Sequence, residues 1–137
     1  MIRIANENDL KSINDLIVDE DYQFNQNDFI SEVNKILVLV VNDKIIGVIK
    51  YTILYERSEL EYLYIDTKYR RKNMASELMN YLFNDLLNSD CKSITLEVAV
   101  DNLGALKLYD NFGCKKIGLR KGYYNGKDAI LMERKLM

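Results

Sequence analysis

The sequence contains no histidine, and this absence narrows the chemistry open to the chain. It excludes Ser–His and Cys–His nucleophilic systems and the zinc motifs that require histidine ligands. Acid–base chemistry therefore falls to Asp, Glu, Tyr, Lys or Cys. Proline is absent too, so the turns must rely on Gly, Asn, Asp and Ser.

Cysteine is scarce, because Cys91 and Cys114 are the only two. They predict neither a disulfide scaffold nor a Cys-rich zinc site, so we expect no metal. The formal net charge of −2 and the pI near 5.2 argue against general nucleic-acid binding. No apolar run approaches the ~20 residues that span a bilayer, and the N-terminus lacks a signal-peptide pattern. We therefore expect a cytoplasmic protein without nucleic-acid or membrane partners.

The pattern of apolar residues predicts one α/β domain over residues 1–137. Alternation and β-branched runs predict strands near residues 2–4, 36–41, 44–54, 60–65, 93–99, 116–124 and 127–135. Helical spacing predicts helices near residues 10–19, 28–33, 75–86 and 102–112. Short turns favour antiparallel pairing, whereas the helix between strands 60–65 and 93–99 lets those two pair in parallel. We expect a mixed, mostly antiparallel sheet flanked by helices on both faces.

A basic loop between a strand and a helix is the most informative stretch. Arg70, Arg71 and Lys72 follow the strand at 60–65 and come directly before the helix. The first turn of a helix has free backbone N–H groups, and the helix dipole favours negative charge there. The loop is therefore a candidate site for a phosphorylated ligand, with a solvated turn as the equal alternative. It lacks GK[ST], so it is not a nucleotide triphosphate loop.

Glu97 and Tyr109 are the candidate acid–base residues. Glu97 lies between Leu96 and Val98, and strand alternation points it away from both. On a sheet covered on both faces this direction is partly buried, which suits a general base, although a glutamate on a solvated strand face is commoner. Tyr109 lies on the apolar side of its helix, where the phenol could donate a proton or simply pack in the core.

Three further residues are weaker candidates. Asn102 begins a helix, either as its cap or as a ligand contact. Tyr123 and Tyr124 lie beside the Asn125-Gly126 turn, either as substrate contacts or as aromatic cover over the end of the sheet. The cations between residues 115 and 121 could meet a phosphate, but a solvated strand face explains them more simply.

Taken together, these motifs resemble the GNAT superfamily of acetyl-CoA-dependent N-acetyltransferases, and most closely its ribosomal-protein-alanine N-acetyltransferase branch. The resemblance covers about residues 59–135. It rests on the basic loop, on Leu96-Glu97-Val98, on the Asn102 to Tyr109 motif, on Asn111-Phe112-Gly113 and on the Tyr123 to Met132 segment.

The chain departs from the family pattern at two positions in the loop. Asn73 stands where the family usually has Gly, and Thr67 replaces a usual proline. Asn is the non-glycine residue most tolerant of positive φ, so we expect the turn to survive.

The resemblance implies a parallel strand pair that splays apart at its C-terminal end, with acetyl-CoA bound there as co-substrate. It implies cofactor contacts from the strand end, the loop and the next helix: Leu63, Tyr64, Ile65, Arg70, Arg71, Lys72, Asn73, Met74, Ala75, Ser76 and Asn102. It makes Glu97 the general base that deprotonates an amine, directly or through water. It makes Tyr109 the general acid at the departing CoA sulfur.

Two interpretations from different classes follow. The first is an enzyme that acetylates a primary amine by direct attack, with a protein N-terminal α-amino group as favoured acceptor and Tyr123 and Tyr124 as its contacts. A polyamine or amino sugar is the alternative acceptor, since residues 20–30 lack the tryptophan-containing pattern of the ribosomal enzymes. The second is a non-catalytic acyl-CoA-binding module. Glu97 and Tyr109 argue against it, because binding alone requires neither.

Overall fold

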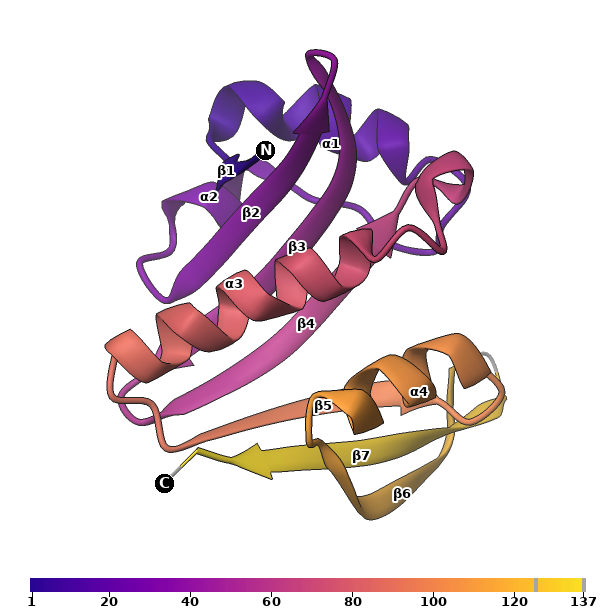
Figure 1. The fold of residues 1–137 in the computed structure, drawn as a ribbon. Coiled ribbons are helices and arrows are strands. Elements are labelled where there is room, and N and C mark those ends of the chain that lie inside the picture. The colour runs from indigo at the N-terminus through magenta and orange to yellow at the C-terminus, as the bar shows by residue number, and fades with distance from the viewer. Residues whose placement is uncertain (125, 137) are drawn as a thin grey trace.

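The computed structural model describes residues 1–124 and 126–136 (Figure 1). Its helices and strands follow one another as β1 (Ile2–Ile4), α1 (Leu10–Leu16), α2 (Gln26–Ile30), β2 (Asn34–Val41), β3 (Lys44–Leu54), β4 (Arg57–Ile65), α3 (Met74–Asn88), β5 (Ser93–Ala99), α4 (Leu103–Asn111), β6 (Lys115–Tyr124) and β7 (Lys127–Lys135). Short 3₁₀ turns at Glu7–Asp9 and Thr67–Tyr69 precede α1 and α3. Among the described helices, none is both long and apolar enough to cross a membrane.

The described strands form one seven-stranded sheet in the order β1-β2-β3-β4-β5-β7-β6. Every neighbouring pair is antiparallel except β4 and β5, which run parallel and are joined through α3. The predicted mixed, mostly antiparallel sheet is therefore confirmed.

Helices cover both faces of the sheet, as predicted. In Figure 1, α3 and α4 lie over one face, and α1 and α2 lie behind it. The buried face of α3 consists of the residues that its periodicity selects: Leu78, Met79, Leu82, Phe83 and Leu86. A second buried cluster on the other face joins the first helices to β2 and β3: Ala5, Ile13, Ile17, Phe24, Ile36, Val38, Ile45 and Val48.

The parallel pair separates along its length. β4 and β5 are paired from Arg57 opposite Ser93 as far as Leu60 opposite Leu96. Beyond this point β4 continues to Ile65 alongside β3, and β5 continues to Ala99 alongside β7. Each strand keeps its outer partner and loses the shared one, so the sheet opens between them. The predicted splay is confirmed.

Three predicted boundaries are wrong, each for a local reason. α1 ends at Leu16 rather than near residue 19, because the apolar pattern continues into Ile17, which is buried without being helical. α2 ends at Ile30, before Val33, because Ser31 is already extended. β4 begins at Arg57, because positive φ at Tyr55 closes the turn within two residues.

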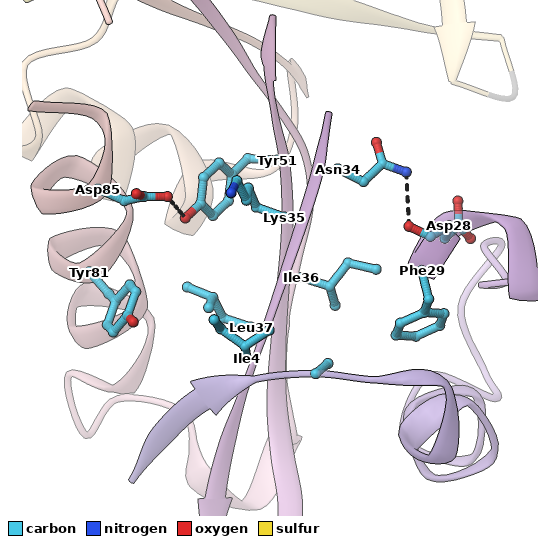
Figure 2. Close-up of a pocket in the computed structure, with 11 residues that line it drawn as sticks. Ile4, Asp28, Phe29, Asn34, Lys35, Ile36, Leu37, Tyr51, Tyr81 and Asp85 are labelled. Carbon is cyan, nitrogen blue, oxygen red and sulfur yellow. Dashed lines mark hydrogen bonds between the residues drawn. The ribbon is translucent and has the colours of Figure 1, made fainter. Parts of the chain in front are cut away.

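A small cavity of about 260 Å³ lies beside the start of β2, next to the end of β1. Figure 2 shows Tyr51 and Asp85 on one side of the strand and Asp28 on the other. The Tyr51 hydroxyl donates to Asp85 Oδ2 at 2.5 Å, and Asn34 Nδ2 donates to the Asp28 carbonyl at 3.0 Å. Burial raises the pKa of Tyr51, and the contact with Asp85 raises it further. These hydrogen bonds therefore connect α3 and α2 to the sheet.

Candidate active site

The opening between β4 and β5 contains a cleft of about 1020 Å³. Residues 60–65 of β4 line one side and residues 96–99 of β5 line the other. The start of α3, one side of α4 and the loop between α1 and α2 complete the wall. The cleft shares no lining residue with the cavity beside the start of β2. The point where the sheet opens is therefore also where a ligand can enter it.

Most residues singled out from the sequence meet in this cleft. They are Leu63, Tyr64, Ile65, Arg70, Arg71, Asn73, Met74, Ala75, Ser76, Glu97, Asn102, Tyr109 and Tyr123. Lys72 does not line it, because its ammonium lies over the Tyr69 ring, 5.6 Å from the centroid. The Tyr124 side chain and all of Asn125 lie outside the described part of the chain, so the predicted contact and turn there stay predictions.

The basic loop is folded tightly against the end of β4. Arg70 Nε donates to the Ile65 carbonyl at 2.9 Å, and its guanidinium lies 5.1 Å from the Tyr64 ring centroid. Arg71 and Asn73 are both left-handed, with φ of 63° and 61°. The expectation that asparagine would tolerate this geometry is confirmed. Left-handed residues of this kind gather backbone N–H groups into a concavity that suits an anion, directly before α3.

Glu97 reaches the cleft from β5. It alternates with the buried residues Leu96 and Val98, and its own side chain is 21% exposed. Arg120 Nη2 of β6 lies 3.1 Å from Glu97 Oε1, and the same guanidinium lies 4.7 Å from the Tyr123 ring centroid. The simple expectation of a solvated cation at Arg120 missed this contact. The β6 cation balances the charge of a half-buried carboxylate.

Tyr109 and Asn102 reach the cleft from α4. Tyr109 is 8% exposed and belongs to the core, and it also lines the cleft. Its role as a proton donor stays a prediction. Asn102 is the helix cap, with its Oδ1 accepting from the Ala105 N–H at 3.1 Å, and it lines the cleft as well. Gly113, at φ 81°, follows the end of the helix in the left-handed conformation that ends many helices.

The sequence interpretation missed a buried ionic group beside the cleft. Lys50 lies in the apolar strand β3 and contacts both Asp28 and Glu61. Glu61 and Tyr22 line the cleft. The available signals were a single lysine within an apolar run and a glutamate beside aromatic residues. Neither pattern shows which residue the charged side chain contacts.

Comparisons with known proteins give a family match and related sequences. The model of the Acetyltransferase (GNAT) family matches residues 1–114. N-alpha-acetyltransferase 30 of Xenopus laevis is 33% identical over 81 residues, which are 58% of this chain and 30% of that protein. The chain spans between 22% and 42% of the length of the first curated relatives that it matches.

Solved structures share the fold along the whole chain. The ribosomal-protein-S18-alanine N-acetyltransferase from Escherichia coli superposes with a TM-score of 0.90 at 22% identity, over 99% of this chain and 93% of that one. A structure of the NatC complex bound to Gag peptide and CoA gives 0.84 at 23% identity, over 100% and 98%. With most of its length matched by the family model, the chain belongs to the GNAT acetyltransferase family.

Proposed function

We propose that this chain is an acetyl-CoA-dependent N-acetyltransferase that acetylates a protein N-terminal α-amino group. The observation that carries the proposal is the opening of the sheet after Leu60 and Leu96, which places the start of α3, Glu97 and Tyr109 around one cleft. The matched N-alpha-acetyltransferase and the neighbour bound to CoA and a peptide support the choice of both substrates.

The proposed acetyl-CoA site uses backbone more than side chains. The N–H groups of residues 71–76 would hold the pyrophosphate, where the left-handed loop meets the positive end of the α3 dipole. Leu63, Tyr64 and Ile65 lie past the last β4–β5 pair, so their backbone can pair with the amides of the pantetheine arm. Asn102 borders the same path at the start of α4.

The proposed chemistry is direct transfer, for which acetyl-CoA supplies the activated acetyl group. An α-ammonium has a pKa near 8, so most of the acceptor is protonated at neutral pH. Glu97 takes this proton, directly or through water, and the neutral amine attacks the thioester carbonyl. As the tetrahedral adduct collapses, its nitrogen releases a second proton to solvent and the carbon–sulfur bond breaks. Tyr109 donates a proton to the departing sulfur. A module that only binds acyl-CoA would need neither residue.

The Ala75→Glu variant tests the pyrophosphate site. It adds bulk and a negative charge to the first turn of α3, where the phosphates would approach. Acetyl-CoA should stabilise the parent by about 2.7 kcal/mol at 100 times its Kd, and this stabilisation should disappear in the variant. The measurement is the shift in Tm on adding acetyl-CoA, with Asn80→Glu on the exposed side of α3 as control. An undiminished shift in Ala75→Glu would mean that the loop is wrongly assigned.

The parent protein tests the choice of acceptor, and the Glu97→Gln variant tests the general base. The parent should acetylate N-terminal peptides in preference to spermidine or glucosamine. The variant should lose ~100-fold or more in kcat, because general-base assistance is typically of that size. Its KM for acetyl-CoA should stay within about twofold, since Glu97 is assigned to the proton and not to the cofactor. Near-parental kcat of the variant at neutral pH would mean that Glu97 has a structural role. If the parent prefers small amines, the proposed peptide acceptor is wrong.

The Tyr109→Phe variant tests the general acid. Phenylalanine keeps the ring in its buried place and removes only the hydroxyl. A thiol pKa is only about 8.5, so the sulfur can leave slowly without a proton donor. Proton donation should speed this step, and we expect its loss to lower kcat by ~10- to 1000-fold. Steady-state transfer is measured together with Tm, and Tyr81→Phe on α3 serves as control. Equal kcat at equal Tm would leave Tyr109 as a core aromatic alone.

A further inference from the structure

Glu61 lies at the point where β4 and β5 separate. The last β4–β5 pair is Leu60 with Leu96, so the next residue on each strand is a glutamate, Glu61 on β4 and Glu97 on β5. Both line the cleft. The β3–β4 register shifts at this point, from Lys50 opposite Tyr62 to Tyr51 opposite Leu60, so Glu61 is the extra residue of a β-bulge. Bulges redirect side chains, and they occur preferentially beside active sites.

Lys50 holds the Glu61 carboxylate in place. The Lys50 side chain is 8% exposed, and its Nζ lies 2.9 Å from Glu61 Oε2 and 2.8 Å from Asp28 Oδ1. The other Asp28 oxygen accepts from the Asn25 N–H at 2.8 Å, which ties the group to the start of α2. One ammonium thus faces two carboxylates, and Glu61, at 31% exposed, is the more accessible of the two. The group carries a net negative charge on its cleft side.

The surroundings of this group are those of a cation site. Burial works to lower the pKa of Lys50, but the hydrogen bonds with Asp28 and Glu61 outweigh it, so Lys50 stays charged. One ammonium that faces two carboxylates leaves one negative charge beside the cleft for a further cation to balance.

Aromatic rings from the sheet and from the α1–α2 loop stand beside the carboxylates. The Tyr22 ring stacks on the Tyr62 ring with centroids 4.3 Å apart, and Lys50 Nζ donates to the Tyr22 hydroxyl at 3.4 Å. Both tyrosines line the cleft. Carboxylates combined with aromatic rings are the partners that an alkylammonium prefers.

We propose that Glu61, positioned by Lys50, is an acceptor-binding residue that holds the ammonium of a primary amine across the cleft from Glu97. The inference rests on the proposed acetyltransferase function and adds the recognition of the acceptor in its charged form. The division of labour is distinct. Glu61 holds the cation without changing any bond, and Glu97 then removes the proton. Loss of Glu61 should therefore weaken acceptor binding, whereas loss of Glu97 should slow turnover.

The Glu61→Gln variant tests this division. We expect KM for the acceptor to rise ~10-fold, while kcat stays within about threefold and KM for acetyl-CoA within about twofold. The fold should persist, because Lys50 keeps Asp28 as a one-to-one partner. Glu59→Gln is the matched control, since it removes the same charge from the same strand at a residue that does not line the cleft. If the glutamine variant melts early, Glu61→Thr removes the charge with a side chain that strands favour.

Two acceptors, an N-terminal peptide and spermidine, separate this inference from the function on which it rests. Both present a primary ammonium, so Glu61 should matter for whichever of them the parent acetylates. A rise in acceptor KM for Glu61→Gln above that for Glu59→Gln supports the inference. Equal acceptor KM values in a parent and variant that both transfer acetyl would overturn it and leave the proposed function standing. A parent that acetylates no amine would overturn both.

Discussion

The structure depends on the point at which β4 and β5 stop pairing. Two parallel strands joined through a helix would ordinarily pair along their whole length, and unpaired backbone groups are costly when buried. Here pairing ends at Leu60 and Leu96, and the backbone beyond is left for a ligand. The separation is held open from outside, because β3 keeps the end of β4 and β7 keeps the end of β5. The start of α3 and one side of α4 meet at the same place. A cofactor rich in amides and phosphates is the ligand that such an edge and such a helix N-terminus fit.

Cations and carboxylates occupy different parts of the opening between β4 and β5. The basic loop and the left-handed residues Arg71 and Asn73 stand where phosphates would lie. Two carboxylates lie where the strands separate. Glu97 is paired with Arg120, and Glu61 shares Lys50 with Asp28. Pairing limits the cost of keeping acidic side chains partly buried before an acceptor arrives. In the function that we propose, a cationic amine enters this region, and Glu97 alone removes its proton.

The sequence predicted the fold and most of the cleft because both depend on local patterns. Helical spacing identified the buried face of α3, and the loop before it follows from Asn73 and its tolerance of positive φ. The sequence could not show the partners of Lys50 and Arg120. Lys50 contacts Asp28 across 22 residues, and that contact depends on how α2 packs on the sheet. Glu61 faces the cleft because of a bulge, which is a property of the β3–β4 register that one strand alone does not reveal.

Amide hydrogen exchange with and without acetyl-CoA tests the central claim most directly, because it reports which backbone groups the cofactor covers. The account predicts slower exchange at residues 61–65 and 71–76 when acetyl-CoA is bound. Residues 57–60, which already pair with β5, should change little. Slower exchange confined to other parts of the chain, such as the cavity lined by Tyr51 and Asp85, with residues 61–65 and 71–76 unchanged, would contradict it.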